Sequence, residues 1–185
     1  MMETDQKLLA KARSGDGAAR AALIERHQKA VVGVLFSLLH DFDSVQEAAG
    51  EAFSEAFAAK GPADKGPGFK VLVMRRTLQG ARSRRRWSWL SGGGSWEASA
   101  ATGGGAWEQR LRGAGGLSAE TRRNLERKLE LERAMSGLPW RELEVAALRL
   151  EGFSLEEIAQ ALGCGGPAAR AAVLAATGRL RRRLL

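Results

Sequence analysis

The sequence predicts an all-α fold, and three observations support that prediction. The 185-residue chain contains no tyrosine, and runs of β-branched residues are rare. Its apolar residues instead recur three and four positions apart, which is the spacing of one helix face. We therefore expect two small helical domains joined by a flexible linker, with boundaries at residues 1–86, 87–117 and 118–185.

Two helices are expected at the start of the chain. The first covers residues 5–14, where Leu8, Leu9 and Ala12 share one side and Gly15 and Asp16 end the helix. The second covers residues 18–39 and has an apolar face that consists of Ala22, Leu23, Val31, Val34, Leu35 and Leu38.

Two further helices complete the N-terminal domain. Asp43 or Ser44 can cap a helix over residues 45–59. Gly-Pro pairs at residues 61–62 and 66–67 then bracket a loop, because proline interrupts helical hydrogen bonding. A fourth helix is expected over residues 69–86.

The central residues 87–117 differ in composition from the rest of the chain. They are rich in Gly, Ser and Ala and have neither a helical nor a strand period. Such a segment cannot bury enough apolar area to offset its chain entropy, so we expect a flexible linker. Its tryptophans either dock on the protein's own surface, which is the simpler alternative, or stack on unpaired bases; they are Trp87, Trp89, Trp96 and Trp107.

The C-terminal domain is expected to begin with helices over residues 119–135 and 140–150. Ser154 and Glu157 then form a capping box, in which the serine oxygen accepts a backbone N–H and the glutamate reaches back to the start of the helix. Leu155, Ile158, Ala159 and Leu162 share one face of the helix that follows.

A short glycine-rich turn separates that helix from the last one. Cys164 lies in the turn, and Pro167 suits the first turn of the final helix. Two helices that are joined by such a turn and preceded by another helix form the pattern of a DNA-binding helix-turn-helix.

The charge of the chain indicates an anionic partner. The net charge is +8, and most of the excess comes from residues 67–112, which carry nine basic and two acidic side chains. Clustered cations gain free energy by displacing counterions from a phosphate backbone.

The composition also excludes several functions. Cys164 is the only cysteine, so no intramolecular disulfide is possible and a reducing, cytoplasmic location is expected. The N-terminus does not resemble a signal peptide, and no apolar run reaches the roughly 18 residues of a membrane span. His27 and His40 are too far apart for one helix face, so we expect no metal, no cofactor and no catalytic site.

The chain resembles the extracytoplasmic-function (group 4) sigma factors of bacterial RNA polymerase. The C-terminal sequence LPWRELEVAALRLEGFSLEEIAQALGC is similar to region 4 of that family. The N-terminal sequences LLAKARSGDGAARAALIERH and DSVQEAAGEAFSEAF are similar to region 2. The resemblance implies a protein that binds core polymerase and promoter DNA, and an anti-sigma factor is a further partner to test.

Two surfaces of the N-terminal domain follow from this resemblance. Glu47, Glu51 and Glu55 lie four residues apart and form an acidic stripe, which the resemblance implies docks on a basic coiled coil of polymerase. The fourth helix carries seven cations, and the resemblance implies that it reads and melts the minus-ten promoter element; they are Lys70, Arg75, Arg76, Arg82, Arg84, Arg85 and Arg86. The loop 60–68 would hold a flipped base.

A third surface lies on the last helix, which would enter the major groove of the minus-thirty-five element. Arg170 is the best candidate for a base contact, because a guanidinium can grip guanine through two hydrogen bonds. The remaining expected contact residues are Pro167, Ala168, Ala169 and Arg179. After Arg170 the helix is rich in alanine, which departs from the family pattern.

Three functions remain open from the sequence. The first is a sigma factor that directs core polymerase to promoters. The second is a degenerate sigma-like regulator that binds polymerase or an anti-sigma factor and reads little DNA sequence, which the alanine-rich helix favours. The third is a DNA-binding regulator that uses only the helix-turn-helix and acts without polymerase.

Overall fold

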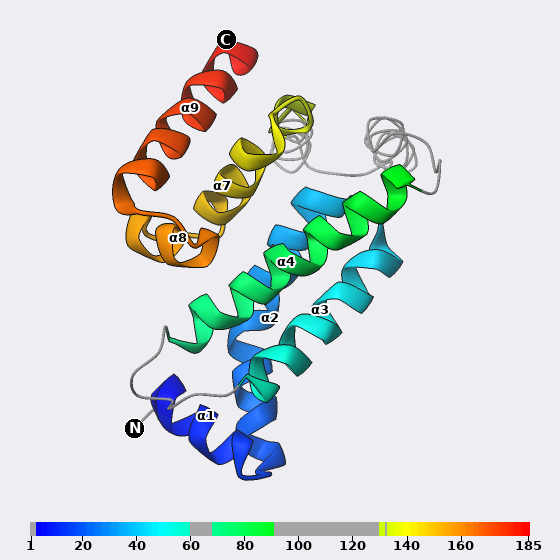
Figure 1. Ribbon diagram of the computed structural model, residues 1–185, viewed down its shortest axis with the longest axis vertical. Coiled ribbons are helices and arrows are strands. Elements are labelled where there is room, and N and C mark those ends of the chain that lie inside the picture. The colour runs from blue at the N-terminus through cyan, green and yellow to red at the C-terminus, as the bar shows by residue number, and fades with distance from the viewer. Residues whose placement is uncertain (1–2, 60–67, 91–129, 132) are drawn as a thin grey trace, which may run out of the picture.

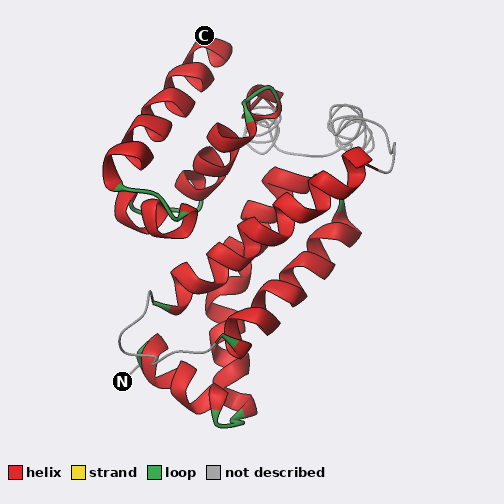
Figure 2. Ribbon diagram, viewed as in Figure 1, coloured by secondary structure: helices red, strands yellow, loops and turns green. Residues whose placement is uncertain are grey.

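The computed structural model describes residues 3–59, 68–90, 130–131 and 133–185. The described part of the chain is helical and contains no strand, which confirms the predicted fold class (Figure 2). The loop 60–67, most of the expected linker with Trp96 and Trp107, and the start of the helix expected over residues 119–135 lie outside the described residues.

Four helices form the N-terminal part of the structure (Figure 1). They are α1 (Asp5–Arg13), α2 (Gly17–Leu39), α3 (Phe42–Ala58) and α4 (Phe69–Leu90). Helix α4 continues four residues beyond its expected end, so residues 87–90, which we expected to be linker, are helical. The predicted apolar side of α1 is buried at Leu8, Leu9 and Ala12.

Side-chain caps fix where α2 and α3 begin. Asp16 accepts hydrogen bonds from the backbone nitrogens of Ala18 and Ala19 at 2.9 and 3.1 Å. Helix α3 is capped by Asp41, whose carboxylate accepts from the Ser44 nitrogen at 2.9 Å. The prediction that Asp43 or Ser44 caps this helix was therefore wrong. The aspartate that lies two residues earlier has the extended backbone of a cap, and so the helix begins three residues sooner.

The C-terminal part contains α7 (Trp140–Leu150), α8 (Leu155–Leu162) and α9 (Gly166–Leu184). The predicted capping box is present, because Ser154 and Glu157 each bond the backbone of the other. Gly163 ends α8 with a φ of 65°, a left-handed conformation that glycine adopts without strain. Pro167 lies in the first turn of α9, as expected. These features confirm the predicted helix-turn-helix geometry.

The two parts pack directly against each other: α4 contacts α8, and α2 contacts α7 (Figure 1). Buried side chains from both parts form one continuous apolar cluster. At Gly33 of α2, a Cβ atom would overlap the carboxylate of Glu151, so glycine allows the end of α7 to lie close to α2. Burial in this contact raises the pKa of Glu151. The division into two domains stays a prediction, but the helices that belong to them share a packed interface.

Candidate polymerase and nucleic-acid interface

The acidic stripe of α3 lies on the surface. The side chains of Glu47, Glu51 and Glu55 are 74%, 60% and 56% exposed. Arg84 of α4 lies 2.9 Å from Glu51 and 3.8 Å from Glu47, and its hydrogen bond lowers the pKa of Glu51. Arg76 lies 3.5 Å from Glu55. Exposed ion pairs contribute only about 0.2–1 kcal/mol, so these arginines hold the stripe weakly.

The cations of α4 point in two directions. Arg76 and Arg84 face the acidic stripe, whereas four others contact groups of the C-terminal helices; these four are Lys70, Arg75, Arg82 and Arg85. Arg86 is exposed and lines an open pocket with Arg82, Arg85 and Trp140. In this arrangement, therefore, most of the cations that were expected to hold promoter DNA are engaged within the chain.

Glu144 of α7 forms the most buried polar contact between the two parts. Its side chain is almost wholly inaccessible to solvent, and Arg82 donates to its two oxygens from Nε at 2.5 Å and from Nη2 at 2.9 Å. Trp140 Nε1 donates to the same carboxylate at 2.8 Å. The hydrogen bond to Glu144 raises the pKa of Arg82. A buried carboxylate is tolerated only when it is paired and hydrogen-bonded, and these donors meet that requirement.

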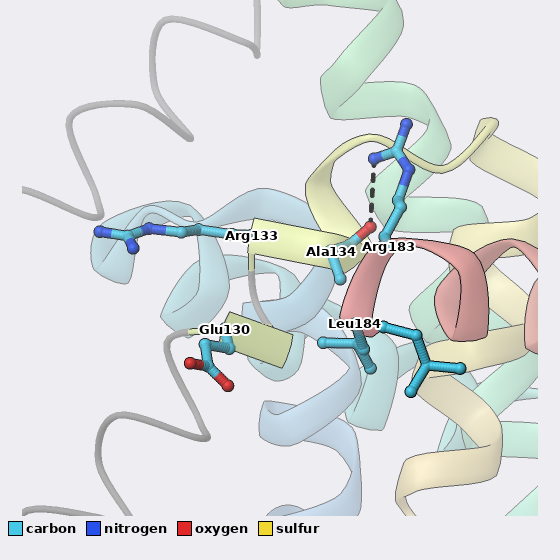
Figure 3. A pocket seen from close by; sticks show the side chains of 6 residues that line it. Glu130, Arg133, Ala134, Arg183 and Leu184 are labelled. Carbon is cyan, nitrogen blue, oxygen red and sulfur yellow. Dashed lines mark hydrogen bonds between the residues drawn. The ribbon is translucent and has the colours of Figure 1, made fainter.

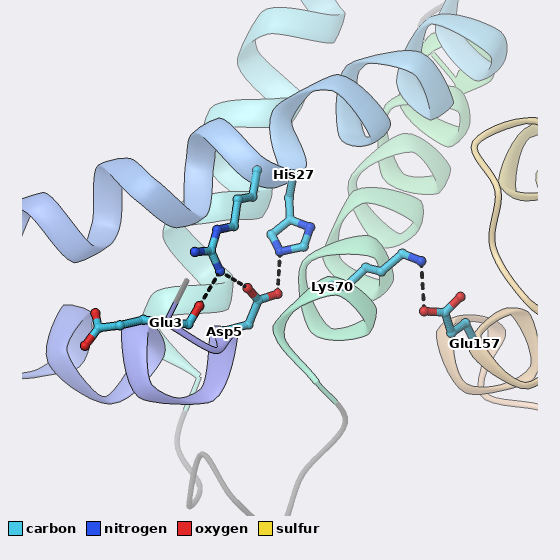
Figure 4. A network of polar contacts seen from close by, with 6 residues as sticks. Glu3, Asp5, His27, Lys70 and Glu157 are labelled. Carbon is cyan, nitrogen blue, oxygen red and sulfur yellow. Dashed lines mark hydrogen bonds and ion pairs between the residues drawn. The ribbon is translucent and has the colours of Figure 1, made fainter. Parts of the chain in front are cut away.

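Lys70 joins the other end of α4 to α8. Its Nζ atom lies 2.8 Å from Glu157 Oε1 and 4.3 Å from the centre of the Phe153 ring (Figure 4). Burial acts to raise the pKa of Glu157, but hydrogen bonds from Lys70 and Ser154 outweigh it, and the pKa lies below its usual value. Glu157 therefore has two roles, since it caps α8 and also holds that helix against α4.

Two more cations of α4 contact the C-terminal part. Arg75 Nη2 donates to the backbone oxygen of Gln160 at 2.8 Å, near the C-terminal end of α8. The Arg85 guanidinium lies 4.4 Å from the centre of the Trp140 ring, which is cation–π geometry. The contacts of Lys70 and Arg85 thus lie at the two ends of the interface between α4 and the helices α7 and α8.

The expected DNA-contact residues on α9 differ in how exposed they are to solvent. Pro167, Ala168 and Arg170 are exposed on its first turns. Ala169 is fully buried in the core, because the helix turns its side chain toward the neighbouring helices. Its contact with DNA stays a prediction. Arg179 lies 2.9 Å from Glu142 of α7 and is half exposed.

Sequence reasoning missed the roles of Glu144 and Trp140 and the second role of Glu157. A signal for Glu144 was available, because it stands among the apolar positions of α7 and lies four residues after Trp140. A carboxylate among core positions requires a buried cationic or N–H partner. Nothing in the sequence indicated that Arg82, 62 residues away, is that partner.

Two other features have no direct role in these surfaces. Asp5 accepts one hydrogen bond from Arg26 at 2.8 Å and lies 2.7 Å from His27, which ties α1 to α2 (Figure 4). A shallow pocket lies between Glu130, Arg133 and Ala134 on one side and the end of α9 on the other, where Arg183 donates to the Ala134 oxygen at 3.3 Å (Figure 3). Both features join neighbouring segments of the chain.

Within the described ranges, no group of three or more His, Cys, Asp or Glu side chains is placed to hold a metal ion. None of the described helices combines the length and the apolar character that crossing a membrane requires.

Comparison with solved structures places this architecture among known folds. The chain is similar to CnrH in the structure of CnrH in complex with the cytosolic domain of CnrY, with a TM-score of 0.69 and 20% sequence identity. The match covers 98% of this chain and 97% of that chain. CnrH is an extracytoplasmic-function sigma factor, and this chain has the same type of fold. No protein-family model and no curated protein matches the sequence.

Proposed function

We propose that this protein is a sigma factor of the extracytoplasmic-function type, which binds core RNA polymerase and directs it to promoters. The observation that carries the proposal is an exposed acidic stripe beside a basic helix and a helix-turn-helix, within a fold shared with CnrH over nearly the whole of both chains. A protein that used only the helix-turn-helix would have no need of the first two surfaces.

The proposed polymerase contact is the acidic stripe on α3. Its three carboxylates project into solvent on successive turns, and the arginines that pair with them come from one side only. A basic helical surface could therefore approach from the open side. Complementary charge of this kind speeds association and fixes the register of the partner.

The proposed promoter contacts lie on α4 and α9. The cations of α4 would hold the minus-ten element, and the exposed first turn of α9 would approach the minus-thirty-five element. The N-terminus of α9 carries a partial positive charge that favours a nearby phosphate. Arg170 is exposed there and could reach a base edge.

An anti-sigma factor is the partner that we propose for regulation. CnrH was solved with the cytosolic domain of CnrY bound to it, and this chain has a similar fold. A partner of that kind would control access to the surfaces of α3 and α4.

One observation favours the second candidate, a regulator that reads little DNA sequence. The outward face of α9 presents Ala168, Ala171 and Ala175, together with Leu174, which is 64% exposed. Small apolar side chains offer no hydrogen bonds to base edges, so sequence reading through this face would depend on Arg170 alone.

The direct test is binding of the purified 185-residue chain to bacterial core polymerase, followed by transcription from a library of promoter fragments. A sigma factor would form a stable complex and start transcription at promoters with a shared motif. A complex without promoter-dependent starts would favour the second candidate, and failure to bind polymerase would reject both.

A further inference from the structure

An open pocket lies where the C-terminal end of α4 meets the start of α7. It has a volume of about 350 Å³, and the residues that line it are Arg82, Arg85, Arg86 and Trp140. The three arginines lie three and four residues apart, so they share one face of α4. Trp140 is the first residue of α7 and forms the wall on that side. The pocket therefore combines several guanidinium groups with one indole ring.

The positive charge at this pocket is only partly balanced. Arg82 pairs with Glu144, but that carboxylate is shared, because Arg141 lies 3.9 Å from it as well. Arg86 is exposed and forms no ion pair with another residue in the described part of the chain. Like charges four residues apart on a helix repel each other, as Arg82 and Arg86 do. An anion in the pocket would relieve this repulsion.

The aromatic wall favours an anion that also carries a flat ring. The Arg85 guanidinium lies 4.4 Å from the centre of the Trp140 ring, so two kinds of planar group that stack on nucleobases stand together. Trp140 Nε1 donates to Glu144, which holds the indole in place before a ligand arrives and reduces the entropy lost on binding. No side chain caps the N-terminus of α7, so its partial positive charge also favours a nearby phosphate.

We propose that this pocket binds a free nucleoside 5′-monophosphate. The phosphate accepts hydrogen bonds from Arg86 and from Arg82 Nη1, which does not contact Glu144, while the base packs against Trp140 and Arg85. A terminal phosphate carries close to two negative charges at neutral pH, so it matches clustered arginines better than a singly charged phosphodiester of a strand. The volume suits a single small ligand, since ligand pockets span about 300–1,000 Å³. This site does not depend on the proposed function.

The test is isothermal titration calorimetry on the 185-residue chain, without polymerase or DNA. The probes are AMP, GMP, CMP and UMP, titrated one at a time, then ribose 5-phosphate, which lacks a base, and the dinucleoside phosphate of the base that binds best. Arg86→Gln removes one charge from the pocket. Arg181→Gln is the matched control, because it removes the same charge from an exposed position of α9. Both side chains are exposed, so both variants should fold.

At least one nucleotide should bind with a dissociation constant on the order of 10–100 μM. Arg86→Gln should weaken this binding about tenfold, whereas Arg181→Gln should change it less than about twofold. Ribose 5-phosphate should bind about fivefold or more weakly, because it has no ring to stack. In ¹H–¹⁵N spectra, the indole N–H resonance of Trp140, identified by its loss in Trp140→Phe, should shift when the nucleotide binds.

The absence of saturable binding by all four nucleotides would overturn the proposal. Equal weakening by Arg86→Gln and Arg181→Gln would also overturn it, because the attraction would then come from the net charge of the chain. If ribose 5-phosphate bound as tightly as the best nucleotide, the pocket would take phosphate without a base, and the assigned ligand class would be wrong. Tighter binding of the dinucleoside phosphate would replace the free nucleotide with an unpaired nucleotide of a strand.

Discussion

The side chain of Glu144 receives two hydrogen bonds from Arg82 and one from Trp140, and together these join α7 to α4. The carboxylate belongs to the helix-turn-helix part and the guanidinium to the N-terminal part. Because both groups would be costly to bury alone, each constrains where the other lies. The position of the C-terminal helices on α4 is therefore set by specific polar groups as well as by apolar packing.

The hydrogen bond from Trp140 can be tested separately. Trp140→Phe keeps an aromatic ring near Arg85 but leaves the buried Glu144 with one donor fewer. We expect a loss of about 1–3 kcal/mol in the free energy of unfolding, measured by urea denaturation. In a Glu144→Leu background the same substitution should cost little, since the acceptor is gone. An equal loss in both backgrounds would mean that ring packing, and not the hydrogen bond, stabilises this site.

The acidic stripe on α3 is the proposed contact with polymerase. Glu51→Lys places a cation in the middle of the stripe and should weaken the affinity for core polymerase about tenfold or more, through like-charge repulsion with a basic partner. The control is Glu25→Lys, which makes the same charge change at an exposed position of α2. Equal effects of the two variants in a titration with labelled polymerase would remove α3 as the contact surface.

Under the proposed function, reading of the upstream element depends on the side chain of Arg170. Arg170→Ala should remove discrimination at one base position, worth about 1–3 kcal/mol, and so change the order of preference among promoters. Arg182→Ala, near the exposed end of α9, should reduce transcription from all promoters alike. A uniform reduction by both variants would show that Arg170 contacts only phosphate.

His40 predicts a dependence of stability on pH. Its backbone has a φ of 56°, and burial lowers the pKa of its side chain below the usual value of 6.5. As the pH falls through 6.5, the unfolded chain takes up a proton that folded His40 does not, so stability decreases. His40→Asn tolerates the same backbone conformation and should reduce this decrease. Urea unfolding of both proteins between pH 7 and about 5 isolates His40, because the other titrating groups are shared. Identical pH profiles would contradict the prediction.

The fold could be predicted because its local signals are strong. The buried positions Leu8, Leu9 and Ala12, the capping box at Ser154 and the left-handed Gly163 follow from periodicity and turn chemistry within a few residues. The cap of α3 could not be fixed in the same way. Three polar residues, Asp41, Asp43 and Ser44, lie close enough to serve, and only the backbone conformation selects Asp41.

The partners of the charged residues were much less predictable. Helical spacing alone indicated the acidic stripe and the basic helix, because each lies within one element. The contacts of Arg82 with Glu144 and of Lys70 with Glu157 join residues that are 62 and 87 positions apart. Such pairs depend on how the two parts of the chain pack, which no local pattern encodes.

The measurement that tests the central claim most directly is in vitro transcription from genomic DNA fragments with bacterial core polymerase, in the presence and absence of this protein. We predict discrete new start sites that share a two-part motif, with its two elements spaced so that α4 contacts one and α9 contacts the other. Glu51→Lys should abolish transcription from these start sites. No new starts with active core polymerase, while the protein still binds that polymerase, would contradict a sigma factor and favour a regulator that only binds polymerase.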